Sequence, residues 1–144
     1  HSWAASASEA RSFAHTVVAV GGDVVCVTAE GQLLRLESRR GEPHWQDTRR
    51  EVPGFCPGTH TAAAADRGAL YLLDVERGGL TTVRELDLRS GEPSHLWRGF
   101  SGSLGPLDVI SSSPLVLGTR LCWFALDGAG ALVGSCLDLA TGAC

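Results

Sequence analysis

A six-residue segment that recurs three times constrains the fold of this chain more than any other feature. Residues 137–142 read LDLATG, residues 86–91 read LDLRSG, and residues 36–41 read LESRRG. The closing glycines, Gly41, Gly91 and Gly142, are spaced by 50 and 51 residues. A near-constant period of this size indicates an array of supersecondary units, so the recurrence predicts architecture before it predicts activity.

Each repeat divides into short strands separated by glycine, proline and acidic residues. The first repeat has apolar or alternating runs at residues 15–20, 24–29 and 32–38, and a fourth strand is expected to begin at His44 and Trp45. The second and third runs are joined across Glu30 and Gly31, which is turn chemistry. A hairpin centred between these two residues predicts Val25 opposite Leu36 and Val27 opposite Leu34.

The second and third repeats follow the same plan. Strands are expected at residues 60–65, 69–75 and 81–88 and around Trp97, and then at residues 112–117, 121–127 and 131–139. No ten-residue amphipathic helical pattern occurs between them. Short, evenly spaced strands separated by turn residues predict an all-β chain.

The repeats resemble the blades of β-propellers, and two families fit the pattern. WD-repeat proteins place Trp-Asp at the end of the third strand; here the acidic position is kept as Glu37, Asp87 and Asp138, while leucine replaces the tryptophan. In PQQ-like propellers the pattern is Leu-Asp, Thr-Gly and then a tryptophan, and Trp45 and Trp97 lie close to that position. The choice between the two families stays open.

The resemblance implies a β-propeller segment of about three four-stranded antiparallel blades. The chain is then one domain, with blades at approximately residues 13–47, 55–99 and 111–144, and with residues 1–5 in a neighbouring blade. A closed propeller needs at least four blades. The remaining blades are therefore expected to be supplied in cis or by oligomerisation.

Composition excludes several classes of partner. The formal net charge is −4, which disfavours nucleic acid, and no apolar run approaches the roughly 18 residues of a membrane span. All twelve basic residues are arginine, a bias that we interpret as a coding preference. Arg39, Arg40, Arg49 and Arg50 could bind a partner, but acidic residues interleave with them and favour a solvated surface of mixed charge.

The five cysteines lack the close pairs of a zinc site, so no metal is expected. A hairpin centred on position 129 places Cys122 opposite Cys136. This pair could form a disulfide in an oxidising compartment, whereas two packed thiols are expected in the cytosol. The compartment stays open, with a cytoplasmic location slightly favoured over an extracytoplasmic one.

No catalytic or cofactor-binding residues are expected, because the polar residues that stand out recur at equivalent repeat positions. Asp87 and Asp138 are expected to hold turns, Gly41, Gly91 and Gly142 to close them, and Trp45 and Trp97 to pack between blades.

The resemblance implies a non-enzymatic protein-binding scaffold that recognises its partner through the long loops at residues 49–58 and 99–108. The alternatives are an extracytoplasmic PQQ-like sensor or assembly propeller and a fragment of a quinoprotein dehydrogenase. The adjacent cysteines typical of such dehydrogenases are absent.

Overall fold

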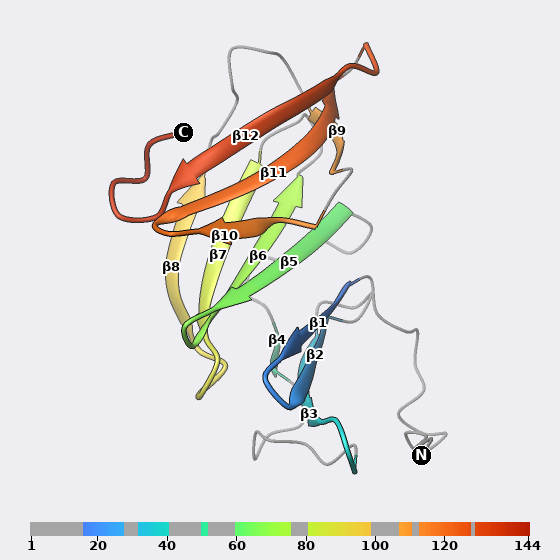
Figure 1. The fold of residues 1–144 in the computed structure, drawn as a ribbon, viewed down its shortest axis with the longest axis vertical. Coiled ribbons are helices and arrows are strands. Elements are labelled where there is room, and N and C mark those ends of the chain that lie inside the picture. The colour runs from blue at the N-terminus through green and yellow to red at the C-terminus, as the bar shows by residue number, and fades with distance from the viewer. Residues whose placement is uncertain are drawn as a thin grey trace. The chain divides into compact units, whose positions relative to one another are not determined.

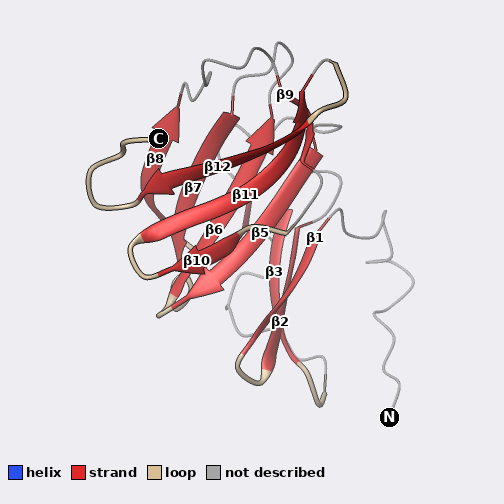
Figure 2. Cartoon of the chain, turned by 45° about the horizontal axis from the view of Figure 1, so that its top comes forward, coloured by secondary structure: helices blue, strands red, loops and turns tan. Residues whose placement is uncertain are grey.

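The structure of the chain is a computed structural model (Figures 1 and 2). It describes residues 16–27, 32–40, 50–51, 60–75, 81–98, 107–110, 113–127 and 129–144. All regular structure in these ranges is β-strand, arranged as three antiparallel sheets, which confirms the predicted all-β class. The chain separates into two compact units, His1–Gly58 and Thr59–Cys144.

The first unit holds one four-stranded sheet with the strands in sequence order. Its strands are β1 (Thr16–Val20), β2 (Asp23–Val27), β3 (Gln32–Glu37) and β4 (Arg50–Glu51). Val25, Val27 and Leu33 are each only 1% exposed. The alternation of buried and half-buried residues along β2 is the period-2 pattern of a strand with one covered face.

The predicted register of the β2–β3 hairpin is wrong by one residue. Val25 lies opposite Arg35, and Val27 lies opposite Leu33. The pairs are therefore centred on position 30 itself and not between positions 30 and 31. The Glu-Gly pair suggested a two-residue turn, but five residues separate the last paired positions, Val27 and Leu33, and an odd number shifts the register by one.

The second unit begins with the sheet of β5 (His60–Asp66), β6 (Ala69–Val75), β7 (Thr81–Asp87) and β8 (Pro93–Arg98), again in sequence order. Four consecutive residues of β6, from position 70 to position 73, are all buried. Because successive side chains point to opposite faces, both faces of this sheet are covered at β6. The continuous apolar run in the sequence therefore marks a strand that is buried on both faces.

The second sheet of this unit contains β9 (Leu107–Ile110), β10 (Leu115–Leu117), β11 (Arg120–Asp127) and β12 (Leu132–Asp138). β12 runs along one edge of β11, so β9 and β10 share its other edge, end to end. The expected loop at residues 99–108 is therefore too long, because its last two residues already belong to β9. Four residues before a Ser-Ser-Ser-Pro run are too few to show a strand period.

The two sheets of the second unit pack face to face over a shared core, and Figures 1 and 2 show β10, β11 and β12 crossing in front of β5–β8. Its buried members are Ala64, Tyr71, Leu73, Val83 and Trp97 from one sheet and Leu121, Trp123, Ala125 and Leu137 from the other. Apolar residues from both inner faces thus form one core, as in other stacked sheets.

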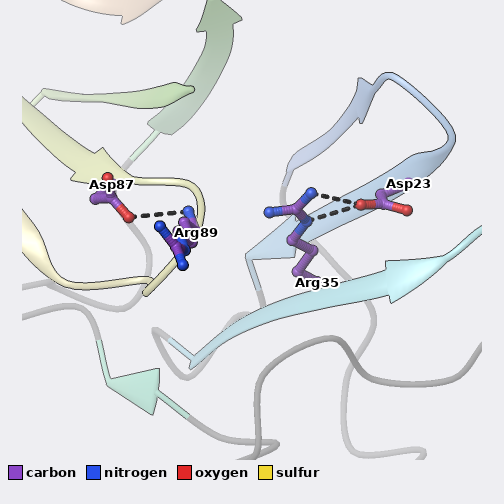
Figure 3. A network of polar contacts seen from close by, with 4 residues as sticks. All are labelled: Asp23, Arg35, Asp87 and Arg89. Carbon is purple, nitrogen blue, oxygen red and sulfur yellow. Dashed lines mark hydrogen bonds and ion pairs between the residues drawn. The ribbon is translucent and has the colours of Figure 1, made fainter. Parts of the chain in front are cut away.

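The recurrent segment closes each of the last two repeats with the same turn. The Oδ1 atom of Asp87 accepts hydrogen bonds from the backbone N–H groups of Arg89 at 2.9 Å (Figure 3) and Ser90 at 2.7 Å, and from Ser90 Oγ at 3.0 Å. These bonds favour the charged carboxylate, so they hold the pKa of Asp87 below its usual value.

Asp138 repeats this arrangement, accepting from Ala140 N at 3.0 Å and from Thr141 N at 2.9 Å. The pKa of Asp138 is lowered for the same reason. The first repeat carries Arg40 where the others have Ser90 or Thr141, so its turn lacks the hydroxyl. The aspartates therefore have the turn role that the sequence predicts.

Two features of the structure favour glycine at position 142: its backbone conformation and a close neighbouring side chain. Its φ is +73°, in the left-handed region. A β-carbon at Gly142 would lie 3.1 Å from Cδ1 and 3.4 Å from Nε1 of Trp97. The glycine that ends the third repeat thus packs against the tryptophan of the second repeat.

We expect Gly142→Ala to destabilise the chain clearly more than Gly118→Ala. Gly118 has a similar φ of +65°, but nothing lies within 4 Å of its missing β-carbon. The left-handed backbone costs roughly 1–2 kcal/mol at either position, and overpacking against Trp97 adds about 1–3 kcal/mol at Gly142 only. Equal midpoints in urea denaturation of the two variants would contradict this contact.

Candidate functional site: an apolar sheet face around a disulfide

One face of the β9–β12 sheet is apolar and uncovered among the described residues. Along β11, Leu121, Trp123 and Ala125 point into the core, and none is more than 2% exposed. Phe124, between them, points to the other face and is 52% exposed. The strand is therefore apolar on both faces, although only one of them is covered.

Neighbouring strands extend this uncovered face. Leu115 and Leu117 of β10 are 55% and 59% exposed, and Leu132 of β12 is 63% exposed. Leu115 pairs with Cys122, and Leu132 pairs with Leu126, which places all of them on the side of Phe124. We call Leu115, Leu117, Cys122, Phe124, Leu126, Leu132, Gly134 and Cys136 the apolar face.

Phe124 lies over the glycine of the neighbouring strand. Gly134 is its cross-strand partner, and a β-carbon at Gly134 would lie 3.1 Å from Cε1 of Phe124. The ring thus covers backbone that would otherwise be bare, a known way of stabilising a glycine within a sheet. The exposed phenylalanine is held against the sheet.

A disulfide lies within the apolar face. Cys122 pairs with Cys136 across β11 and β12, with the Cα atoms 4.1 Å apart, and the two residues are disulfide-bonded. This register is the one expected from a hairpin centred on position 129. Cys122 is half-buried and Cys136 is exposed.

The described part of the chain contains two further cysteines, Cys26 and Cys144, both free thiols. Cys26 is half-buried in β2, and burial raises the pKa of its thiol. A raised pKa lowers the thiolate fraction, which disfavours Cys26 as a nucleophile.

The apolar face has an equivalent in the preceding repeat. Superposing the ladders turn on turn matches Cys122 and Phe124 with Tyr71 and Leu73, and Gly134 with Val83. Tyr71, Leu73 and Val83 are buried against the following sheet. The same face of the repeat is thus covered in one sheet and uncovered in the next.

The arginines proposed to bind a partner do not form a site within the described residues. Arg39 and Arg40 are exposed in the turn after β3. Arg50 lies in β4, paired with Leu33, and not in a connecting loop as expected. Arg49, Trp45 and Gly41 lie outside the described residues, as does most of each predicted binding loop.

Among the described residues, the structure shows two ion pairs with largely buried side chains that sequence reasoning missed. In the first unit Arg35 donates from Nε at 2.9 Å and from a terminal nitrogen at 2.6 Å to one oxygen of Asp23, as Figure 3 shows. In the second unit Arg84 pairs with Asp74, and their side chains are only 5% and 4% exposed. The sequence signal for such a pair was a lone charged residue within an apolar strand. Only the strand register of the structure identifies the residue that pairs with it.

Neither a metal site nor a membrane-spanning helix occurs among the described residues. They contain no group of three or more potential metal ligands. They also contain no helix that is long and apolar enough to cross a membrane.

Comparison by sequence identifies no relatives. No protein-family model matches the chain, and no curated protein matches it. Any likeness to known proteins therefore lies in the arrangement of its strands.

Comparison by structure finds β-propeller proteins. BamB from Moraxella catarrhalis is 23% identical with a TM-score of 0.51, over 88% of this chain and 34% of that one. Quinohemoprotein alcohol dehydrogenase from Comamonas testosteroni is 19% identical with a TM-score of 0.58, over 92% of this chain and 20% of that one. The computationally designed protein Ika8 is 14% identical, also with a TM-score of 0.58, over 88% of this chain and 33% of that one.

These likenesses establish the fold of the chain as that of a β-propeller segment. The chain spans between a fifth and about a third of the length of these three structures.

Proposed function

We propose that this chain is a non-enzymatic protein-binding module and that it docks a protein partner on the apolar face of β9–β12. The observation that supports the proposal is the set of four large apolar side chains, Leu115, Leu117, Phe124 and Leu132, each more than half exposed on one sheet. A contiguous patch of this kind marks an interaction surface.

The occupant that fits this face is a β-sheet of the same repeat type. Within the chain, the equivalent face of β5–β8 is covered by Leu121, Trp123, Ala125 and Leu137 of the next sheet. A surface with this alternation of large and small apolar residues therefore complements the apolar face. In solutions of the chain alone, that surface is already buried in the core of each copy, so the apolar face of a second copy is the exposed apolar sheet surface available to pair with it.

The expected gain is large enough to hold two sheets together. Fully burying a leucine or phenylalanine side chain contributes about 1.5–3 kcal/mol. Each of the four side chains is about half exposed, so covering each would contribute on the order of 1 kcal/mol. The total of several kcal/mol, less the entropy of association, corresponds to weak and concentration-dependent pairing.

Sedimentation velocity over a concentration series tests this proposal. We expect the chain to self-associate, and Leu132→Asp or Leu117→Asp to shift it towards monomer while changing stability by less than about 1 kcal/mol, because the sites are exposed. Leu96→Asp is the matched control, since Leu96 is 43% exposed on β8, outside the apolar face. A wild-type chain that stays monomeric throughout would contradict the proposal.

The loops at residues 49–58 and 99–108 are the surface that the sequence favours for partner binding. Replacing residues 52–58 and 99–106 with Gly-Ser linkers separates the two surfaces. Association that survives the linkers and is lost in Leu132→Asp assigns binding to the apolar face. Association that is lost with the linkers and survives in Leu132→Asp assigns binding to the loops.

An extracytoplasmic sensor or assembly role is the second candidate, and the Cys122–Cys136 disulfide favours it. Disulfides persist in oxidising compartments and are rare in the cytosol. The likeness to quinohemoprotein dehydrogenases supports no catalytic proposal, because at 15–19% identity it concerns the fold alone.

A further inference from the structure

The Cys122–Cys136 disulfide lies within the apolar face and is open to solvent. Cys122 lies opposite Leu115 of β10, and the next residues on the same face of β11 and β12 are Phe124 and Gly134. Cys136 is exposed and Cys122 is half-buried. A disulfide with this exposure is accessible to a thiol while the chain stays folded.

Neither of the other two sheets has a disulfide at this place. The equivalent cross-strand pair is Val25 with Arg35 in the β1–β4 sheet and Tyr71 with Glu85 in the β5–β8 sheet. The shared fold therefore does not require a covalent bond between these two strands. The disulfide is a feature of the β9–β12 sheet that the repeat does not explain.

The strand that this disulfide holds, β12, has little other support. Its equivalent, β7, pairs with β6 on one edge and with β8 on the other, and five of its seven residues are buried. Among the described strands β12 pairs with β11 alone, and one of its seven residues, Leu137, is buried. Because a strand with few buried residues opens easily, the covalent bond to β11 is a main restraint on β12.

We propose that the Cys122–Cys136 disulfide is a site for small dithiol reductants, and that its reduction loosens β12 and weakens docking on the apolar face. A thiolate of the reductant attacks Sγ of Cys136, and Sγ of Cys122 leaves with the electron pair and takes up a proton. The second thiol of the reductant loses its proton and attacks the reductant sulfur bonded to Cys136, which releases Cys136 as a thiol. The reductant is oxidised to a disulfide as both cysteines are reduced, a transfer of two electrons and two protons.

Exposure and strand order select Cys136 as the sulfur that is attacked first. A thiolate displaces the leaving sulfur along the line of the sulfur–sulfur bond, so it approaches Cys136 from the side away from β11. No described strand pairs with β12 on that side. Attack on Cys122 would come from the side of β10, where Leu115 lies opposite it.

Reduction acts on the apolar face through the order of β12. The disulfide closes a loop with a sequence separation of 14, which restricts the opened hairpin, and reduction removes this restriction. β12 contributes Leu132 and Gly134 to the apolar face, and Phe124 lies over Gly134. Since only copies with an ordered face dock, loosening lowers the apparent affinity. This last step rests on the docking proposed above, whereas the loosening of β12 does not.

Reduction under native conditions tests the site itself. Substituting Cys26, Cys56 and Cys144 with serine leaves Cys122 and Cys136 as the remaining cysteines, and we call this chain the single-disulfide variant. We expect dithiothreitol to reduce it at a rate proportional to the reductant concentration. Brief exposure to glutathione and an acid quench should give, by mass spectrometry, a mixed disulfide on Cys136. A rate that levels off at the unfolding rate, or a mixed disulfide on Cys122, overturns the proposed reaction.

Amide hydrogen exchange of the dilute single-disulfide variant measures the loosening. A disulfide that closes a loop of this size changes the opening equilibrium by on the order of a hundredfold, so we expect β12 amides to exchange at least about tenfold faster after reduction. Amides of β2, in the first unit, are the internal control. Adding Cys122→Ser and Cys136→Ser should give the fast exchange with or without reductant. Equal exchange of β12 in the oxidised and reduced chains overturns the proposal.

Sedimentation velocity in oxidised and reduced samples separates this inference from the docking proposal. We expect the apparent dissociation constant for self-association to rise at least about threefold on reduction, and the variant without Cys122 and Cys136 to show no response to reductant. Equal association of the oxidised and reduced chains overturns the control of docking. If neither state associates while β12 exchanges faster after reduction, the docking proposal is contradicted and the reducible restraint on β12 is supported.

Discussion

Truncating Trp97 to alanine is expected to lower the free energy of unfolding by about 3–5 kcal/mol, as for other buried tryptophans. Trp97 is 8% exposed and belongs to the core shared by the two sheets of the second unit. Its ring also contacts Gly142 of the next repeat. The substitution therefore opens a cavity at the seam between two repeats, where neither sheet can close it alone.

Urea denaturation of the purified chain measures this effect, and His95→Ala is the matched control. The ring of His95 lies 4.2 Å from that of Trp97, but the residue is exposed, so its removal should cost less than about 1 kcal/mol. A loss below about 1 kcal/mol in Trp97→Ala, together with lost partner binding, would make Trp97 a ligand-binding residue instead.

Replacing Arg84 with methionine is expected to destabilise the chain by about 3–5 kcal/mol, the usual result of removing one partner of a buried ion pair. Methionine keeps much of the length of the side chain and removes its charge. Asp74, 4% exposed as a side chain, would then retain a buried charge without this cation. Breaking the ion pair should therefore lower the free energy of unfolding by more than the lost packing alone would.

The double variant Arg84→Met, Asp74→Leu provides the control. Replacing both partners of a buried pair with apolar residues of similar size is often close to neutral, so we expect the double variant to recover most of the loss. Chemical denaturation of all four proteins gives the coupling free energy of the pair. A double variant that loses the sum of the two single losses would contradict this coupling.

Much of the second unit could be predicted from the sequence, because its strands carry local signals. The run at residues 69–75 and the turns after Asp87 and Asp138 lie where the sequence places them. The facing of Cys122 and Cys136 also follows from the position of one turn. Strand period, turn chemistry and hairpin symmetry are short-range properties, so a single sequence is enough to reveal them.

Tertiary structure alone decided which faces are covered and which charges are paired. The sequence makes β11 apolar on both faces, yet only the packing against β5–β8 shows that Trp123 is buried and Phe124 exposed. Val25 pairs with Arg35 and not with the expected Leu36, so the register of this hairpin differs by one residue from the one that the turn signal predicts. The partners of Arg84 and Trp97 depend on strands that folding brings together, and neither composition nor strand period records such contacts.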